Sequence, residues 1–415
     1  MSEQISRAVV ARLYPNRVQA ASLRRWQGGL RRIWNESLAW CFAQRADAGK
    51  WPGKAAIQAY MVSLKRREET RWMAEIPAHA ILALAEDQRR ALKNWFEKRA
   101  KRPKFRGKRH RQFSVYMVNQ QTGFGEAKVS LPKLGEVRFR AGDLPAGRLL
   151  GARAYREADK WYLSAVFECD PPDYVSPAVE RAGVDMGLKT MATVYDGAQI
   201  VEIRSPKALR EHEMRLKRYQ RQYARRVPGS KRREEAKRRV AREHQRVANI
   251  RKDCAHKATS WLVRHAQEIV VESLNVAGMM RNRHLAKSVA DTGMGEFLRQ
   301  VRYKGQWQRR DVIEADRWYP STKLCSKCDS HNPDVVLGVD AWTCPACGTR
   351  HQRDENAARN LYAYPEERGN AGGLPPKTRG ETGDQDRAAT PAPAPVIEPR
   401  ISKRASQNHR VAQSK

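Results

Sequence analysis

The sequence lacks any apolar run that approaches the roughly 20 residues a membrane-spanning helix needs. Residues 1–7 also lack the apolar stretch that marks a secretion signal. These absences exclude an integral membrane protein, and we expect a protein of the bacterial cytoplasm with no membrane partner. Cysteine is scarce as well: of seven, three stand alone and four form two Cys-X-X-Cys pairs. This spacing is typical of metal binding and does not suggest a disulfide framework.

Acidic residues are few in comparison with basic ones. The 415 residues include 45 Asp and Glu against 80 Lys and Arg, a formal net charge of +35. Such a charge opposes compact folding unless a polyanion neutralises it, and nucleic acid is the commonest polyanion available to a cytoplasmic protein. The hydrophobic fraction of 40% is nevertheless sufficient for a real core. The length predicts two or three domains.

The positive charge is concentrated in two segments. Residues 89–111 contain twelve Lys and Arg, and 99–111 contain no acid. Residues 204–252 contain 19 Lys and Arg against five Asp and Glu. A face that only contacts solvent usually mixes charges of both signs. We therefore favour contact with nucleic-acid phosphates over a solvated face in both segments.

The first half of the chain predicts a strand, a helical block and a group of short strands. Residues 5–13 alternate in polarity as a strand does, and from 19 to 98 apolar residues recur at helical spacing, with breaks near 50–53 and 76–77. Between 113 and 170 short apolar runs are separated by Gly and Pro. A small β-barrel or a curved sheet fits this pattern, and the first strand could join it.

The second half begins after a proline-rich boundary and predicts a mixed α/β domain. An Asp-Gly turn between apolar runs indicates a meander of three strands. Further elements are expected as follows: a long helical segment over 205–265, strands over 268–272 and 311–316, and a helix from about 353 to 365. Residues 366–415 contain few large apolar side chains, so we expect a disordered tail.

Four cysteines have the spacing of a metal site: Cys325, Cys328, Cys344 and Cys347. Each Cys-X-X-Cys turn can direct two thiolates at one ion, and the 15 residues between Cys328 and Cys344 are enough for a hairpin that closes a tetrahedron. We predict a structural zinc ribbon, with a redox-active dithiol as the alternative. Four sulfur ligands leave no open position for substrate, so this zinc would stabilise the fold and would not catalyse.

Three carboxylates are candidates for a second metal site. Asp185 interrupts a strand that should be buried, Glu272 ends an apolar strand, and Asp354 lies near the start of a helix. Each has an ordinary explanation, because strand-end acids often form ion pairs and an acid in the first helical turn complements the helix dipole. Together they suggest a site for Mg²⁺ or Mn²⁺, which prefer oxygen ligands. Two such ions activate water and stabilise the leaving oxygen in phosphodiester hydrolysis.

Four stretches carry motifs in a characteristic order: residues 183–193, 271–282, 320–328 and 344–360. Together they resemble the TnpB (OrfB) proteins of bacterial insertion sequences, relatives of the small type V CRISPR effectors. The resemblance implies a multidomain fold of α/β and α+β parts with a RuvC-type nuclease domain, which is RNase H-like and contains an inserted four-cysteine zinc ribbon. A β-barrel wedge domain carrying an inserted helical recognition domain would precede it.

Transferred to this sequence, the family layout predicts the following boundaries: a first wedge strand at 1–15, the recognition domain at 16–98, the wedge barrel at 99–175, the nuclease domain at 176–365, the zinc ribbon at 320–350 and the tail at 366–415. The resemblance also implies that Asp185, Glu272 and Asp354 are the catalytic, Mg²⁺-binding residues and that the four cysteines bind zinc.

The function implied by the resemblance is that of an RNA-guided DNA endonuclease of a transposable element. Its partners would be a guide RNA and a double-stranded DNA target, and we expect a monomer in the RNA complex. A CRISPR effector nuclease and an RNA-guided DNA-binding repressor that does not cleave are the alternatives. A basic ribosome-associated zinc protein accounts for the charge but not for the three carboxylates.

Overall fold

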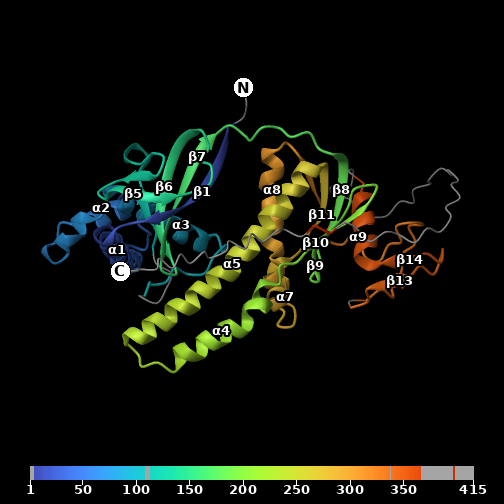
Figure 1. Cartoon of the computed structure of the whole chain (residues 1–415). Helices are drawn as coiled ribbons and strands as arrows, with labels where there is room; N and C mark the ends of the chain where they lie inside the picture. Colours follow the sequence, from blue (N-terminus) through green and yellow to red (C-terminus); the bar gives the residue numbers. More distant parts are fainter. Residues whose placement is uncertain (1–3, 108–112, 337, 366–395, 398–415) are drawn as a thin grey trace, which may run out of the picture. The chain divides into compact units, whose positions relative to one another are not determined.

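The computed structural model describes residues 4–107, 113–336, 338–365 and 396–397, and the chain divides into two units, Met1–Pro171 and Pro172–Lys415 (Figure 1). Apart from residues 396–397, the expected tail lies outside the described residues, as do residues 108–111 of the first basic segment. None of the helices in the described part of the chain is long and apolar enough to cross a membrane.

The first unit contains a seven-stranded antiparallel sheet in the order β2-β6-β7-β1-β5-β4-β3. Its strands are β1 (Ile5–Tyr14), β2 (Val115–Met117), β3 (Gly123–Phe124), β4 (Lys128–Leu131), β5 (Gly135–Arg140), β6 (Gly147–Glu157) and β7 (Lys160–Cys169). The first strand joins this sheet, one of the arrangements that the sequence allows, and lies between β7 and β5. Within the described residues no ladder joins β2 to β3, so the hydrogen bonding is that of an open sheet.

Three α-helices and one 3₁₀ helix follow β1: α1 (Arg17–Ala48), α2 (Lys54–Ser63), η1 (Glu68–Glu75) and α3 (Ala78–Phe96). The predicted helix breaks at 50–53 and 76–77 are confirmed. α1 begins with a capping box, in which Asn16 and Gln19 each accept a hydrogen bond from the backbone N–H of the other. Its buried face, which includes Leu30 and Ile33, joins one apolar core with the sheet.

The second unit contains a six-stranded mixed sheet in the order β12-β11-β8-β9-β10-β15. The strands are β8 (Val179–Asp185), β9 (Thr190–Tyr195), β10 (Ile200–Arg204), β11 (Ala266–Glu272), β12 (Asp311–Ala315) and β15 (Val396–Ile397). β8, β9 and β10 form the predicted antiparallel meander, whereas β11 runs parallel to β8 and to β12.

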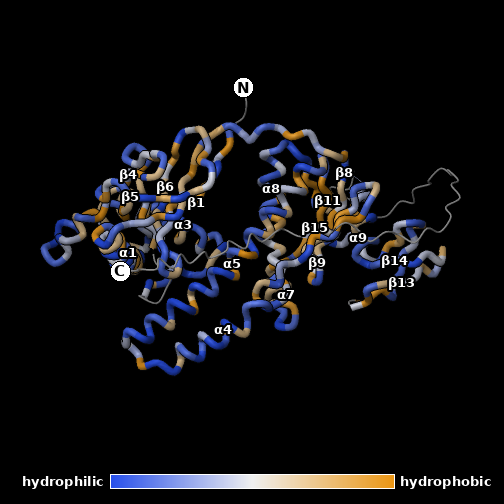
Figure 2. The backbone as a smooth tube through the Cα atoms, viewed as in Figure 1, coloured by the Kyte–Doolittle hydropathy of each residue, from blue (hydrophilic) through white to orange (hydrophobic). Residues whose placement is uncertain are grey.

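Helices cover both faces of this sheet. The helices of the unit are α4 (Ala208–Ala224), α5 (Lys231–His265), α6 (Val276–Met279), α7 (Ala286–Thr292), α8 (Met294–Trp307) and α9 (Arg353–Tyr362). Alternate residues of β11 contact different cores: Ile269 packs with α5 and α8, and Val270 packs with Leu361 of α9. Figure 2 shows the contrast between the apolar strands of this sheet and the hydrophilic pair formed by α4 and α5.

Candidate active site and metal centre

The three predicted carboxylates meet at one edge of the six-stranded sheet. Asp185 is the last residue of β8 and Glu272 is the last residue of β11. These strands are parallel neighbours, with Val184 paired to Val271, so their carboxyl ends lie together. Asp354 is in the first turn of α9, which packs over β8. The topology thus brings together side chains that are up to 169 positions apart in the sequence.

A glycine allows α9 to approach this closely. A Cβ atom on Gly183 would lie 2.2 Å from the backbone oxygen of Ala358 and 2.2 Å from the backbone nitrogen of Tyr362. Real Cβ atoms do not make such contacts, so only glycine permits this approach of helix backbone to strand. Gly187, two residues after the end of β8, lies near the first turn of α9, since a Cβ on it would lie 3.7 Å from Asp354 Oδ2. Gly183 therefore determines how near Asp354 comes to Asp185.

Asp185 and Glu272 lie in an environment that disfavours negative charge. Burial raises the pKa of Asp185 well above its usual range, and the neighbouring charges of Glu272 and Asp354 raise it further. Burial also raises the pKa of Glu272, although the Ser321 hydroxyl, which donates a 2.8 Å hydrogen bond to Glu272 Oε1, opposes the shift. Mutually repelling buried carboxylates of this kind are an oxygen donor set that a divalent cation would stabilise.

Two residues beside the cluster were not predicted from the sequence as site residues. Ser321 holds Glu272, as described above, and the Arg353 guanidinium donates hydrogen bonds of 2.8 and 3.0 Å to Asp354 Oδ1. Both lie within the motif stretches 320–328 and 344–360. Their location in these motifs could have marked them as site residues. A lone Ser or Arg in a motif does not, however, indicate which carboxylate it contacts.

The four predicted cysteines form one cluster whose Sγ atoms all lie within 4.8 Å of one another. Two of the Sγ pairs, Cys325 with Cys347 and Cys328 with Cys344, are 3.7 Å apart. A tetrahedron with Zn–S bonds of about 2.3 Å has edges of about 3.8 Å, so these separations fit a tetrahedral ion. The short hairpin of β13 (Ala341–Thr343) and β14 (Arg350–Gln352) lies in the same segment.

The cysteine cluster is connected to the carboxylates through α9. Asn356 and Asn360, both buried on this helix, donate hydrogen bonds of 2.7 and 2.6 Å to the carbonyl of Leu324, directly before Cys325. Asn360 also donates to the carbonyl of Ser321, the residue whose hydroxyl holds Glu272. The ribbon, the helix of Asp354 and the contact to Glu272 therefore form one hydrogen-bonded assembly.

A cleft of about 570 Å³ opens beside Asp354. Its walls come from the β8–β9 turn, the start of α4 and the ribbon, and they include the cationic side chains Lys189, Arg204 and Lys207. Lys189 forms an ion pair with Asp340 of the ribbon. The lining also includes the acids Glu202, Asp340 and Glu355 besides Asp354, so the cleft mixes both signs of charge.

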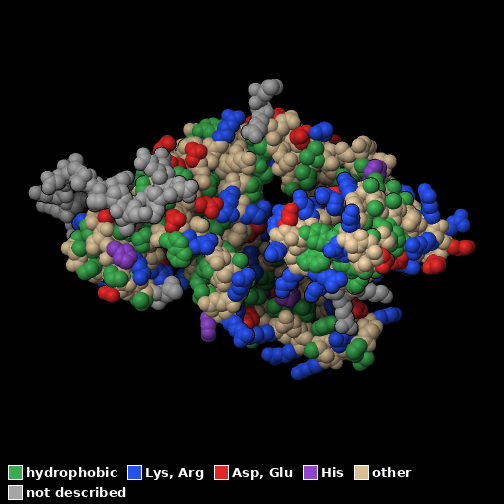
Figure 3. Space-filling view, turned by 180° about the vertical axis from the view of Figure 1, so that it is seen from behind, with side chains coloured by type: hydrophobic (Ala, Val, Ile, Leu, Met, Phe, Trp, Pro, Cys, Tyr) green, Lys and Arg blue, Asp and Glu red, His purple; other side chains and the backbone are tan. Residues whose placement is uncertain are grey.

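The two basic segments adopt different structures. In the first, residues 99–107 form no helix or strand and are held against α1. The Asn35 side chain donates to the backbone carbonyl of Arg106 and accepts from its N–H, and the Arg102 guanidinium lies 4.1 Å from the ring centre of Phe42. The second forms the antiparallel pair α4 and α5. Four of its five acids form ion pairs: Glu213, Glu234, Glu235 and Glu243. Figure 3 shows Lys and Arg spread over the face drawn, with fewer Asp and Glu.

Comparison with solved structures finds a similar fold. It superimposes on the protein of a structure described as "Cryo-EM structure of the Cas12f1-sgRNA-target DNA complex" with a TM-score of 0.55 and 12% identity, covering 86% of this chain and 99% of that one. The fold is therefore shared at low sequence identity.

Comparison with sequence families is more specific. Residues 164–283 match the OrfB_IS605 model, "Probable transposase", and residues 295–361 match the "Cas12f1-like, TNB domain". A Streptomyces pristinaespiralis protein named "Putative RNA-guided DNA endonuclease" is 31% identical over 88% of this chain and 90% of its own length. The Escherichia coli K12 protein "Putative RNA-guided DNA endonuclease InsQ" is 28% identical over 85% and 90%. The chain belongs to the insertion-sequence TnpB (OrfB) family.

A third model, "Helix-turn-helix domain", matches residues 1–50. In the structure the described residues of this range form β1 and the single long helix α1. The Gly28-Gly29 pair, which could suggest a turn, lies inside α1, and a Cβ on Gly29 would lie 2.5 Å from Ile76 Cδ1. Gly29 thus permits close packing against Ile76, and neither glycine breaks the helix.

Proposed function

We propose that this protein is an RNA-guided DNA endonuclease of a transposable element, and that Asp185, Glu272 and Asp354 are its catalytic residues. The observation that carries the proposal is the meeting of these three mutually repelling carboxylates at one sheet edge. Family membership and the names of the two relatives support the activity. The surplus of 35 positive charges supports a guide RNA and a double-stranded DNA target as partners.

In finer detail, the second unit would be a RuvC-type, RNase H-like nuclease domain with the zinc ribbon at 320–350 inserted. The meander β8-β9-β10 followed by parallel β11 and β12 supports this reading. The sheet of the first unit would be the wedge domain, and α1 to α3 would be the inserted recognition domain. The four-cysteine cluster would hold structural Zn²⁺.

In the mechanism that we propose, Asp185, Glu272 and Asp354 would hold Mg²⁺ or Mn²⁺ through their carboxylate oxygens. The bound ions would supply an activated water and stabilise the leaving oxygen of the phosphodiester. Ser321 keeps the Glu272 carboxylate oriented, and Arg353 does the same for Asp354. Lys189, Arg204 and Lys207, which line the cleft beside Asp354 among several acids, would contact phosphates of the bound strand.

The test is cleavage of a plasmid by the protein loaded with its guide RNA in the presence of Mg²⁺. Asp185→Ala, Glu272→Ala or Asp354→Ala should each reduce the rate by several orders of magnitude and leave guided DNA binding intact, because each removes a metal ligand but no basic residue. Double variants should be little worse than single ones, since the three act as a unit.

Glu314→Gln is a matched control, because Glu314 is a partly exposed acid on β12, the strand beside β11, where it pairs with Arg302. This variant should cut normally. If Asp185→Ala cuts at close to the normal rate, the assignment of the site is wrong. If the unmodified protein binds guided targets but never cuts them, the non-cleaving repressor replaces the endonuclease.

A further inference from the structure

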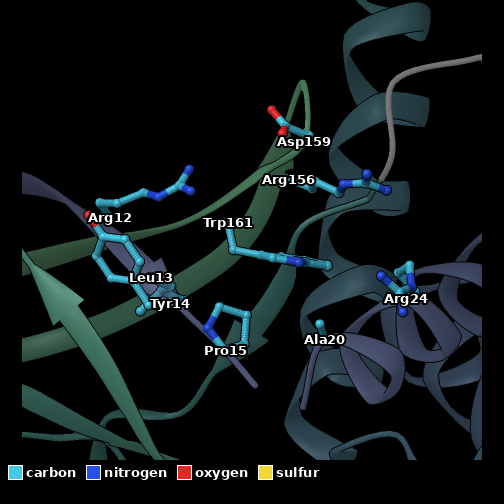
Figure 4. Close-up of a pocket in the computed structure, with 9 residues that line it drawn as sticks. All are labelled: Arg12, Leu13, Tyr14, Pro15, Ala20, Arg24, Arg156, Asp159 and Trp161. Atoms are coloured by element: carbon cyan, nitrogen blue, oxygen red, sulfur yellow. The ribbon is translucent and has the colours of Figure 1, made fainter. Parts of the chain in front are cut away.

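A second candidate site lies in the first unit, far along the chain from the carboxylates. It is a pocket of about 290 Å³ where β1 ends and α1 begins, opposite the turn between β6 and β7. Figure 4 shows the Trp161 indole in its centre, with Arg12 and Tyr14 on one side and Arg156 and Arg24 on the other. Trp161 is buried, so it forms a rigid floor between the two sides.

The charge of this pocket favours an anion. Three guanidinium groups line it from three elements, Arg12 from β1, Arg24 from α1 and Arg156 from β6. Asp159 is the one carboxylate among the residues that line it. Guanidinium groups bind phosphate through pairs of parallel hydrogen bonds, so arginines on several sides of one pocket are well suited to a phosphodiester.

Arg12 is held in place before any ligand arrives. Its guanidinium lies 5.2 Å from the ring centre of Tyr14 and 5.2 Å from that of Tyr162. Its Nη1 is buried and has no hydrogen-bond acceptor among the described residues. A guanidinium that is fixed between two rings and short of acceptors can bind an anionic oxygen with little further loss of conformational entropy.

The pocket continues into a row of aromatic and basic side chains across the sheet. Tyr155 of β6 is directly opposite Tyr162 of β7, which is directly opposite Arg12 of β1. Directly opposed residues share one face of a sheet, and the two tyrosine rings are stacked 5.6 Å apart. Tyr14, two residues beyond Arg12 on the same face, is 49% exposed. An exposed ring next to guanidinium groups is a platform for an unpaired base.

We infer that this pocket binds a phosphate of an unpaired nucleic-acid strand through its arginines, while the neighbouring base stacks on Tyr14. RNA and DNA share this chemistry, so the experiment distinguishes between them. The inference deepens the proposed function, since it assigns one of the nucleic-acid contacts of that activity to named residues. It does not involve the carboxylates of the second unit.

The experiment measures binding of the full-length protein, freed of nucleic acid at high salt, to labelled oligonucleotides of one sequence. The probes are single-stranded RNA, single-stranded DNA and duplex DNA. Arg24→Gln should weaken binding of a single strand about tenfold and make its salt dependence shallower by about one charge. The matched control is Arg25→Gln, because Arg25 is next in sequence, is outside the pocket and pairs with Glu75. It should bind nearly normally.

A second pair of variants tests the stacked base. Tyr14→Leu removes the exposed ring and should weaken single-strand binding about tenfold, whereas Tyr14→Phe keeps the ring and should bind normally. Tyr14 is half exposed at the end of β1, so neither variant should unfold the protein. A loss on RNA alone, on DNA alone or on both identifies the source of the strand and supports the site.

The inference is overturned if Arg24→Gln and Arg25→Gln weaken binding equally, since the effect would then be one of total charge. It is also overturned if only the duplex loses affinity or if Tyr14→Leu binds normally. Guided cleavage is measured separately on the same proteins. If the unmodified protein never cuts but the paired variants still differ in binding, the proposed function fails while the pocket stands.

Discussion

Gly183 shows how one residue determines the geometry of the candidate active site. We predict that Gly183→Ala will lower the free energy of unfolding of the protein by about 3 kcal/mol or more, because its methyl group must displace the backbone of α9. Cleavage should fall with it, since the same displacement moves Asp354 away from Asp185. Chemical denaturation and the plasmid assay measure these effects.

Gly295→Ala is the control for this prediction. Gly295 lies within α8, and a Cβ there would contact only Val276 Cγ1, at 3.5 Å. It should be neutral or slightly stabilising, as Ala favours a helix. Equal stability of the two alanine variants would show that α9 does not require the close approach at Gly183.

His256, on α5, leads to a prediction of how the stability of the protein depends on pH. Burial, together with the charges of Lys304 and Lys252, lowers its pKa to about 4. Between about pH 6.5 and pH 4 the unfolded chain therefore binds a proton that the folded chain does not, so the free energy of unfolding should decrease as the pH falls through this range. Denaturation at pH 7.0, 5.5 and 4.5 measures the slope. The free energy of unfolding of His256→Gln should depend less on pH. An unchanged slope would contradict the lowered pKa of His256.

At the scale of elements, the ribbon and α9 depend on each other. Buried Asn356 and Asn360 bind the chain directly before Cys325, so a disordered ribbon would leave two buried amide groups without partners. Each such group costs about 1–3 kcal/mol. We therefore expect loss of the ribbon's metal to weaken the position of α9 and of Asp354.

Cys344→Ser tests this dependence. The variant should lose zinc and reduce guided cleavage at least tenfold, because zinc binding supplies folding energy to so small a module. Metal analysis and the plasmid assay give the two readouts. Ser326→Ala, which keeps all four thiolates, is the control and should retain both zinc and activity. Zinc-free protein with full activity would refute the role of the ribbon.

At the scale of the whole molecule, the net charge of +35 is the main determinant of nucleic-acid binding. We expect protein purified at low salt to carry RNA, because residues 204–252 alone contain 19 Lys and Arg against five Asp and Glu, and this surplus needs an external anion. The absorbance ratio at 260 and 280 nm and sequencing of the bound RNA measure this. Affinity should fall steeply as salt rises. Protein that is free of RNA and binds it no better than a small basic control would contradict the prediction.

The sequence by itself determined the element types and the residues with unusual chemistry. Apolar spacing predicted the breaks at 50–53 and 76–77, the Asp-Gly turn predicted the meander, and Cys-X-X-Cys spacing predicted the sulfur cluster. These signals are local, because turns, helical periodicity and paired thiolates depend on neighbours only a few residues away. Motif resemblance also indicated the family, which the comparisons show.

Only the tertiary structure decided how the predicted residues meet. The parallel pairing of β8 and β11 places Asp185 and Glu272 at one edge, and the close approach at Gly183 brings in Asp354. The register of three strands likewise aligns Arg12 with Tyr162 and Tyr155. Such contacts join residues distant in the sequence, and their geometry depends on which surfaces are buried against each other. Local periodicity carries no information on that choice, so these sites follow from packing and strand register alone.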